Sequence, residues 1–443
     1  MPRSVRQGMA VVAVAVAVSL TAACGSSGTA GPSSGPSGSA SSGAASGGAA
    51  PWTGELTVWH YWDGKNADTF AAMANAYSAA HPAVTLKVVN VPGSDLQTKL
   101  QAAASSHTLP DISIGDLVNV PKLAQTGQLA DLKPLVPAGT WSDIYPAMLS
   151  FGKKDAEQVS IPVSANTLGL IYNKDLIAKA GLDPAKAPAT WEEMKQASAA
   201  VLAKTGKPGF ELYTQAGDNG EGLTWNFQVS LWQAGGEFLS ADNTKAAFNT
   251  AAGKEALQYW VDLIKAKASP LGPWGVFEKG NAASAQEGSW MVGIWAADAP
   301  FKFGTAQIPA PSNGKPATNM GGEQAVVFKS DAGKQKAAAD FLTWFDDPAQ
   351  SSSWSEQTGF LPVRQSVAKD AGYKAFILRT SPLSQPFIDA LATAHARPNT
   401  PRYGDASLAF AKQIEKALYG KATVDQALAA AEKDVNAALA ASS

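Results

Sequence analysis

The feature that most constrains the fold is a repeated switch between strand and helix periodicity in the first part of the body. The pattern predicts, in order, a strand at 56–59, a helix containing 70–77, a strand at 84–89, a helix over 94–105 and a strand at 111–114. This βαβαβ order is typical of a mostly parallel sheet with helices on both faces. The fold class is therefore predicted to be α/β.

Residues unsuited to a protein core follow two of these strands. His60, Tyr61, Trp62 and Asp63 come directly after the first strand, and Asp116 follows the third. In open α/β sheets, ligands bind outside the carboxyl ends of the strands. We therefore expect these aromatic rings and carboxylates to meet at one rim of the sheet and to contact a polar ligand there.

A second α/β unit is predicted after the segment 160–177. Within this segment, Ser164, Ala165 and Asn166 interrupt two apolar runs, which suits a crossover between two lobes. The remaining pattern predicts strands at 301–311 and 323–328. It also predicts a helix that begins at a capping box at Thr190, a helix over 254–266, a helix that includes 338–345, a helix that ends near Gly420 and a helix that begins at Thr423.

The N-terminus has the character of a secretion signal. Arg3 and Arg6 precede an uncharged apolar run over 9–20, which is shorter than the roughly 20 residues of a membrane-spanning helix. Cys24, the only cysteine of the chain, follows. The segment resembles a bacterial lipoprotein signal, in which the mature chain begins at a lipid-modified cysteine, although Thr21 replaces the usual aliphatic residue.

The segment after Cys24 is predicted to be a tether. Residues 25–50 contain only Gly, Ser, Thr, Ala and Pro, a composition that cannot bury a core. If Cys24 carries a lipid, the folded body is held at the outer face of the bacterial cell membrane.

Composition argues against several classes of function. The chain has 35 Lys and Arg against 37 Asp and Glu, a formal charge of −2, and no basic run, so no nucleic-acid partner is expected. The four histidines do not have metal-ligand spacing, and neither a phosphate-binding loop nor a nucleophile elbow is found. No metal and no cofactor are expected.

Several stretches in one order resemble the extracellular solute-binding proteins of sugar ABC importers, the group that includes maltose-binding proteins. The stretches are LTVWHYW at 56–62, LPDISIGDLVNVPKLAQTGQLADL at 109–132, IPVSANTLGLIYNKDLIAKAGLDPAKAPATWEEM at 161–194, EKGNAASAQEGSWMVGIW at 278–295 and a final one at 328–366. The resemblance implies a two-lobe clamp of the periplasmic-binding-protein type, in which residues 52–164 and 303–362 form one lobe and 165–302 and 363–443 form the other.

The resemblance also assigns candidate binding residues in the first lobe. Aromatic rings cover the C–H faces of a sugar, and carboxylates, amides and arginine pair with its hydroxyls. The first-lobe and crossover candidates are His60, Tyr61, Trp62, Asp63, Asp116, Asn119 and Asn166. Gly115 and Asn119 depart from the residues of the maltose-binding relatives, so maltose itself is not carried over.

The other candidates come from the second lobe and from late loops. Trp295 matches a tryptophan that stacks on sugar in the family, and Trp225 opens an expected helix. The remaining candidates are Asp298, Gly322, Glu323, Arg364 and Tyr403. Glycine at 322 permits the close approach of a ligand to the backbone.

Two other functions stay open from the residues alone. A secreted glycoside hydrolase also needs aromatics and a pair of opposed carboxyls, but no pair stands out. A receptor for glycerol phosphate or a phosphodiester would use Arg364, Arg397 and Arg402, which are scattered. The favoured hypothesis is a monomeric, non-enzymatic receptor that binds a small carbohydrate and delivers it to the transmembrane subunits of an ABC importer, with the membrane as a further partner through Cys24.

Overall fold

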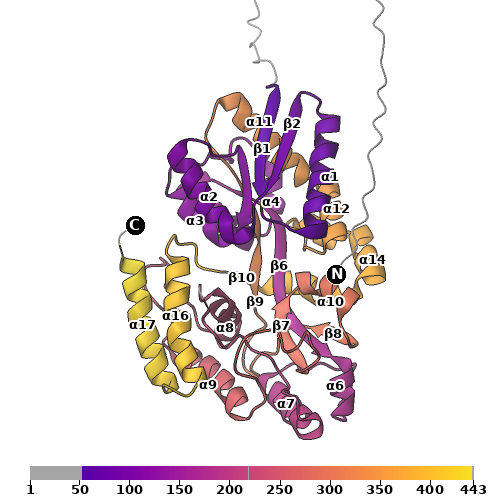
Figure 1. The fold of residues 1–443 in the computed structure, drawn as a ribbon, viewed down its shortest axis with the longest axis vertical. Coiled ribbons are helices and arrows are strands. Elements are labelled where there is room, and N and C mark those ends of the chain that lie inside the picture. The colour runs from indigo at the N-terminus through magenta and orange to yellow at the C-terminus, as the bar shows by residue number, and fades with distance from the viewer. Residues whose placement is uncertain (1–51, 218, 442–443) are drawn as a thin grey trace, which may run out of the picture. The chain divides into compact units, whose positions relative to one another are not determined.

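A computed structural model describes residues 52–217 and 219–441 of the chain (Figure 1). The predicted signal, Cys24 and the tether lie outside the described residues. The strands are β1 (Gly54–His60), β2 (Val84–Asn90), β3 (Ile112–Asp116), β4 (Lys153–Lys154), β5 (Glu157–Gln158), β6 (Ile161–Asn173), β7 (Ser284–Gly288), β8 (Phe303–Ala306), β9 (Thr318–Val327) and β10 (Ala394–Ala396).

Helices are the more abundant element. They are α1 (Gly64–Ala80), α2 (Gly93–Ser106), η1 (Leu117–Asn119), α3 (Val120–Ala124), α4 (Ala138–Asp143), α5 (Pro146–Leu149), η2 (Ser150–Gly152), α6 (Lys174–Lys179), α7 (Trp191–Thr205), α8 (Glu221–Gln233), α9 (Ala251–Lys265), α10 (Trp290–Asp298), α11 (Ala332–Phe345), α12 (Pro348–Thr358), α13 (Gln365–Lys369), α14 (Ala371–Thr380), η3 (Pro382–Ser384), α15 (Gln385–Ala390), η4 (Leu391–Thr393), α16 (Tyr403–Leu418) and α17 (Val424–Ala440).

The predicted α/β class is confirmed, but the sheet is mixed. β2, β1 and β3 are parallel neighbours, as the βαβαβ pattern predicts. β9 then pairs antiparallel with β3 and with β6, and β6 pairs antiparallel with β7 and β8. The expectation of a mostly parallel sheet in each lobe is therefore wrong for the second lobe, because its strands do not come from successive βαβ units.

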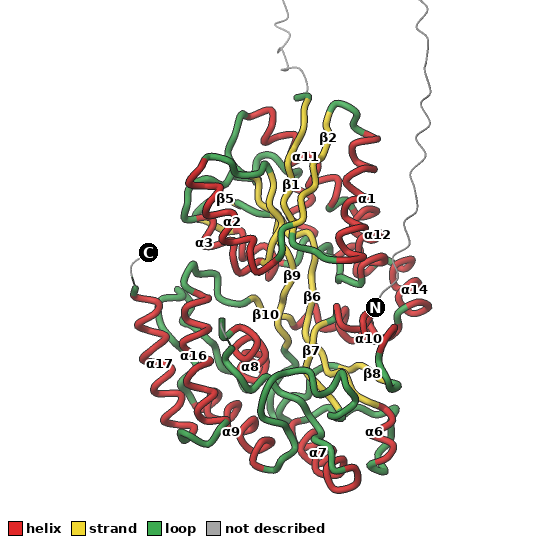
Figure 2. Tube along the Cα trace, viewed as in Figure 1, coloured by secondary structure: helices red, strands yellow, loops and turns green. Residues whose placement is uncertain are grey.

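Two long strands connect the lobes, as Figure 2 shows. Over 161–167 β6 pairs with β9, and over 168–173 it pairs with β7 and β8. We use "first lobe" for β1–β3 with α1, α2, α3, α11 and α12, and "second lobe" for β7 and β8 with α6–α10, α16 and α17. Since β8 pairs with the second-lobe half of β6, the chain returns to the first lobe later than the predicted boundary at 302/303, within β9.

The body has two large apolar clusters, and the first extends from the first lobe to β7, β8 and α10 of the second. Leu56, Val58 and Phe70 pack against α11 in the first lobe, and Trp260, Phe227 and Phe410 are centred between α8, α9 and α16 in the second. At about 25 cal/mol per Å² of apolar area, burial of this kind supplies most of the driving force for folding. The first cluster continues past the crossing strands, so the two lobes share part of their core.

Local signals in the sequence fix several helix ends. The predicted capping boxes at Thr190 with Glu193 and at Thr423 with Gln426 both form. The helix predicted to contain 70–77 is α1, and Gly420 follows α16. Within the described part of the chain, no helix is both long and apolar enough to cross a bilayer.

Candidate functional site

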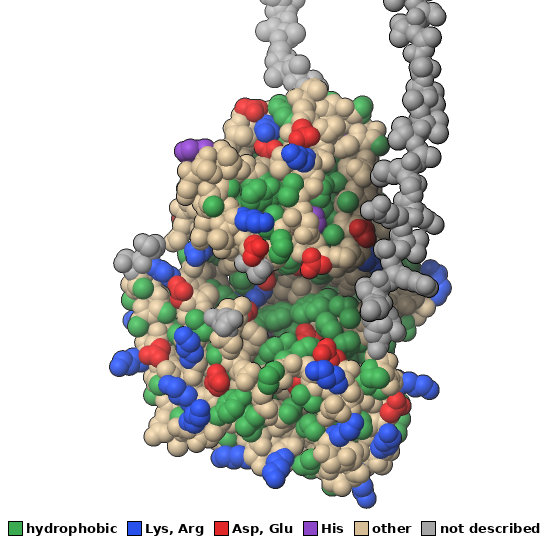
Figure 3. All heavy atoms as spheres, viewed as in Figure 1, with side chains coloured by type: hydrophobic (Ala, Val, Ile, Leu, Met, Phe, Trp, Pro, Cys, Tyr) green, Lys and Arg blue, Asp and Glu red, His purple; other side chains and the backbone are tan. Residues whose placement is uncertain are grey.

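A cavity of about 690 Å³ lies where β6 and β9 pass between the lobes. Figure 3 shows the surface hollowed there, with hydrophobic side chains on the wall of the second lobe. Its walls come from both lobes and from the crossing strands. The lining residues are Tyr61, Trp62, Asp63, Lys65, Asn66, Asp116, Asn166, Glu221, Trp225, Trp290, Gly293, Ile294, Gly321, Gly322, Glu323, Gln357, Thr358, Phe360 and Arg397.

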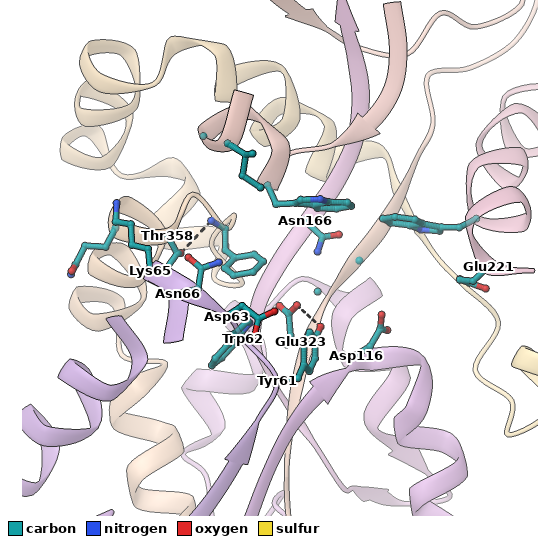
Figure 4. Close-up of a pocket in the computed structure, with 18 of the residues that line it drawn as sticks. Tyr61, Trp62, Asp63, Lys65, Asn66, Asp116, Asn166, Glu221, Glu323 and Thr358 are labelled. Carbon is teal, nitrogen blue, oxygen red and sulfur yellow. Dashed lines mark hydrogen bonds between the residues drawn. The ribbon is translucent and has the colours of Figure 1, made fainter. Parts of the chain in front are cut away.

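The loop after β1 supplies the aromatic floor of the first lobe. Tyr61, Trp62 and Asp63 all line the cavity, as predicted for this rim of the sheet (Figure 4). The Trp62 ring is 3% exposed, because it packs 4.7 Å from Trp354 and 5.1 Å from Phe70 between ring centroids. Trp62 is therefore held rigidly, with only an edge available to a ligand.

A pair of carboxylates stands beside this floor. Asp116 and Glu323 occupy directly opposed positions on β3 and β9, and Tyr61 Oη donates a hydrogen bond of 2.7 Å to Glu323 Oε1. Burial of the Glu323 carboxyl, with the nearby charge of Asp116, raises its pKa to about 8. Glu323 is therefore largely protonated at neutral pH and can donate as well as accept a hydrogen bond.

The second lobe provides a stacked pair of tryptophans. Trp225 near the start of α8 and Trp290 at the start of α10 have ring centroids 5.6 Å apart and planes inclined by 8°. Gly288 makes room for this arrangement, because a Cβ there would lie 2.0 Å from the Trp290 ring. Both rings are half-buried, so they offer a broad apolar surface to the cavity.

An arginine joins the two lobes at one end of the cavity. Arg397 Nη1 lies 2.6 Å from Glu221 Oε1, and its Nη2 lies 3.5 Å from Asp116 Oδ1. The guanidinium also covers the Trp225 ring at 5.2 Å. Burial alone would lower the pKa of Arg397, yet Asp116 and Glu221 raise it above its ordinary value. Arg397 therefore stays charged and paired.

The crossing strands bring the backbone close to the cavity. Gly321 and Gly322 line it, and Gly322 has a φ of +134°, a value that glycine alone adopts readily. A Cβ at Gly321 would lie 2.0 Å from Asn166 Oδ1, and one at Gly322 would lie 2.2 Å from the carbonyl oxygen of Ser164. Gly322 thus lies at the cavity wall, and Asn166 projects from β6 over the same point.

Several lining residues carry buried polar atoms that lack a hydrogen-bond partner within the described residues. They are Trp62 Nε1, Asn166 Oδ1, Trp225 Nε1, Glu323 Oε2 and Arg397 Nε. The Trp62 indole N–H also lowers the pKa of Glu323, although no hydrogen bond of ordinary geometry joins the two groups. Because buried polar groups are nearly always satisfied, this group of atoms points to a polar ligand.

A second cavity of about 440 Å³ adjoins the first. The two share Tyr61, Asp116 and Glu221, and the second also includes the predicted residues Asn119 and Tyr403. The Tyr403 ring is buried, and its hydroxyl donates 3.1 Å to Glu221 Oε1 and accepts 2.9 Å from Gln228 Nε2. The Tyr403 hydroxyl therefore makes both of these hydrogen bonds within the protein and holds Glu221 in place.

Three predicted binding residues lie elsewhere in the structure. His60 is 2% exposed against Phe70, and burial lowers its pKa to about 4, so it is a neutral core residue. Arg364 is buried between Asp143 and Asp346, at 3.4 Å and 3.6 Å, away from both cavities. Trp295 packs against Trp274 and Phe277. The side chain of Asp298 lies outside the described residues.

Trp295 lies outside the cavity for a simple geometric reason. In α10, Trp290, Gly293 and Ile294 line the cavity, and they follow the i, i+3, i+4 spacing of one helical face. Trp295 falls on the opposite face, where it is buried with Val292. The helical spacing of residues 290–295 could have identified Trp290 as the cavity residue from the sequence.

Sequence reasoning missed Glu221 and named Arg397 only for the glycerol phosphate alternative. Glu221 stands one helical turn before Trp225 on α8, so an i, i+4 reading from Trp225 would have found it. Arg397 follows β10 and reaches the site only because β10 pairs with β9. No local pattern marks it. Over residues 52–441, apart from those left undescribed, no group of acidic, histidine or cysteine side chains has the arrangement of a metal site.

Comparison with known proteins gives related sequences and structures. The profile of the bacterial extracellular solute-binding proteins matches residues 72–379. The crystal structure of a cyclic α-maltosyl-1,6-maltose-binding protein from Arthrobacter globiformis is 60% identical, covers 87% of this chain and 99% of its own, and has a TM-score of 0.85.

Two further relatives are more distant. The GacH receptor of Streptomyces glaucescens, solved unliganded and with acarbose, is 26% identical with a TM-score of 0.75, covering 87% of this chain and 98% of its own. The maltotriose-binding protein of Pyrococcus abyssi is 23% identical over 365 residues, 80% of this chain and 75% of its own.

Proposed function

Since this chain belongs to the bacterial extracellular solute-binding proteins, we propose that it captures a compact α-glucan oligosaccharide between its lobes and presents it to an ABC importer. The observation that best supports this proposal is the interlobe cavity, in which the stacked Trp225 and Trp290 face a rim of carboxylate and amide groups. Apolar rings and paired hydrogen-bonding groups are what a sugar requires.

A cyclic sugar built from two maltose units is the favoured ligand. The Arthrobacter globiformis relative, at 60% identity, is named for cyclic α-maltosyl-1,6-maltose. The cavity volume of about 690 Å³ lies within the range of about 300–1,000 Å³ typical of small-molecule sites. A ring-shaped oligosaccharide fills such a volume with few free torsions, so it loses little conformational entropy on binding.

Lobe closure would follow from contacts made by both walls. Tyr61, Asp63 and Asp116 belong to the first lobe, whereas Trp225 and Trp290 belong to the second. A ligand that contacts both walls favours the closed form by the difference between its affinities for the two forms. The importer's transmembrane subunits would then recognise the closed receptor, which acts as a monomer and catalyses no reaction.

We also propose that Cys24 anchors the receptor to the outer face of the cell membrane. The apolar run before Cys24 and the Gly/Ser/Ala/Pro segment after it support this proposal. In cells, the wild-type protein should fractionate with the membrane and Cys24→Ala should appear in the soluble fraction. Equal distribution of the two proteins would refute the anchor.

A charged ligand is less favoured by the lining. Lys65 and Arg397 are the cationic residues among those that line the described cavity, and Arg397 is already paired with Asp116 and Glu221. Asp63, Asp116, Glu221 and Glu323 would repel a phosphate to the extent that they are ionised. A neutral sugar meets no such repulsion.

Isothermal titration calorimetry tests the proposal. The purified protein is titrated with cyclic α-maltosyl-1,6-maltose, maltotetraose, maltose and glycerol phosphate, and each mixture is then analysed for hydrolysis. Tight binding of the cyclic sugar without turnover is expected, together with little dependence on salt. Binding of glycerol phosphate alone, or release of glucose, would replace the proposal with one of the other two functions.

A further inference from the structure

The two cavities lie next to each other, and two residues of a charged bridge line both of them. Asp116 at the end of β3 and Glu221 at the start of α8 face each other from opposite walls in Figure 4. Both residues line both cavities. Arg397 lies between their carboxylates and lines the larger cavity, at 4% exposure. The bridge Asp116–Arg397–Glu221 therefore spans the cleft from one lobe to the other.

The contacts of Arg397 make this bridge rigid on the second-lobe side. Its guanidinium is held by Glu221 at 2.6 Å and by the face of Trp225 at 5.2 Å, and Glu221 in turn accepts hydrogen bonds from Tyr403 and Ser407. The first-lobe contact is looser, at 3.5 Å from Asp116, whose side chain is 43% exposed. The Asp116 contact is therefore the part of the bridge that can be removed without leaving a buried charge unpaired.

The smaller compartment has the lining of an oligosaccharide site. Tyr61 forms one wall, and Gln97, Asn119 and Lys122 bring polar groups to it without a hydrogen-bond partner among the described side chains. Asn219 and Asp405 complete the polar rim on the second-lobe side. Amide, ammonium and carboxylate groups next to aromatic rings suit the hydroxyls and C–H faces of a further sugar unit.

We infer that the smaller compartment is an additional glucose-accepting subsite, and that the contact between Asp116 and Arg397 closes it off from the ligand in the larger cavity. This inference rests on the proposed function. The bridge makes the larger cavity a blind space at this end, which favours a compact ring over a linear chain. A linear α-glucan can extend into the smaller compartment only when the contact opens.

Asp116→Ser is the most direct test. A serine hydroxyl still accepts the hydrogen bond that Asp116 Oδ1 takes from the Val118 N–H at 3.0 Å, but it is too short to reach Arg397. Calorimetry compares linear maltoheptaose with cyclic α-maltosyl-1,6-maltose on the full-length protein. The ratio of the two affinities should shift at least threefold toward maltoheptaose, and a smaller shift would overturn the inference.

A second substitution tests whether the gain in affinity for maltoheptaose arises in the smaller compartment. In the Asp116→Ser background, Gln97→Met replaces an amide of the smaller compartment with a side chain of similar length. It should abolish most of the gain for maltoheptaose, and retention of the gain would show that the chain extends elsewhere. Asp340→Ser, which removes an exposed aspartate of α11 paired with Lys336, is the matched control and should leave the ratio unchanged.

The same series separates the two proposals. If the wild-type protein binds neither glucan, the proposed function fails and this inference fails with it. If the wild-type protein binds the cyclic sugar but Asp116→Ser does not change the ratio, only the inference about the bridge is overturned. Circular dichroism of each variant establishes that the folded protein is being compared.

Discussion

Trp225 and Trp290, which are far apart in the sequence, stack with their ring centroids 5.6 Å apart and nearly parallel planes. One ring comes from α8 and the other from α10, so the pair exists only because the second lobe brings the starts of these two helices to the same wall of the cavity. The Arg397 guanidinium covers the Trp225 ring, and Gly288 leaves space for the Trp290 ring. The pair is thus fixed before any ligand arrives.

Trp290→Leu should weaken binding of the cyclic sugar at least tenfold, about 1.4 kcal/mol, because it removes half of the stacked surface. Trp295→Leu on the opposite face of α10 is the matched control. It should lower the free energy of unfolding by on the order of 3 kcal/mol and leave the affinity of the folded protein within a factor of three. Calorimetry and urea denaturation check the pair. A larger affinity loss in Trp295→Leu would restore the role that the sequence predicted for it.

Gly321→Ala should reduce ligand affinity by about tenfold, about 1.4 kcal/mol, with the fold retained. The new Cβ would lie 2.0 Å from Asn166 Oδ1 and 3.2 Å from the Trp225 ring, so Asn166 must move from its place in the cavity. Gly139→Ala in the first turn of α4, where a Cβ meets no atom within 4 Å, is the control. Unchanged affinity in Gly321→Ala would show that the position of Asn166 does not matter for binding.

The buried carboxyl of Glu323 predicts a pH dependence of stability. Its folded pKa of about 8 exceeds the ordinary value of 4.5, so the folded state binds more protons and loses stability as the pH rises toward 8. His60 acts in the opposite direction only below its ordinary value of 6.5, because burial lowers its folded pKa to about 4. The window from pH 6.5 to 8 therefore isolates the acidic groups.

In wild-type protein the free energy of unfolding should fall as the pH rises through this window. In Glu323→Gln the slope of this fall should be smaller by about 1 kcal/mol per pH unit, where a single group can contribute at most about 1.4 kcal/mol per pH unit. Glutamine still accepts the hydrogen bond from Tyr61. Glu287→Gln on β7 is the comparison, since burial raises the pKa of Glu287 only to about 7 and its contribution ends at a lower pH. Identical pH profiles for wild-type protein and Glu323→Gln, measured by urea denaturation, would contradict the assignment.

Arg364→Met should destabilise the fold by about 3–5 kcal/mol without weakening sugar binding, because it removes the buried cation that pairs with Asp143 and lies 3.6 Å from the buried Asp346 carboxyl. Arg379→Met on the exposed face of α14 removes the same group at the surface and should change stability by less than about 0.5 kcal/mol. Thermal unfolding and calorimetry measure the two effects. Loss of binding in folded Arg364→Met would return this residue to the binding site.

Periodicity and capping were sufficient to predict much of the fold. The βαβαβ start, the capping boxes at Thr190 and Thr423, and the aromatic and acidic residues after β1 and β3 are local signals, because each depends on residues a few positions apart. They placed Tyr61, Trp62, Asp63 and Asp116 at one rim, where the cavity lies. Carboxyl ends of parallel strands must meet at one edge, so this part needed no tertiary information.

Tertiary structure decided everything that depends on which distant surfaces meet. The antiparallel strands of the second lobe, the packing of α10 that turns Trp290 to the cavity and Trp295 to the core, and the bridge from Asp116 through Arg397 to Glu221 all depend on segments separated by long stretches of chain. A sequence pattern reports how a residue relates to its neighbours along the chain, whereas pairing across the cleft is set by how the two lobes pack around β6 and β9.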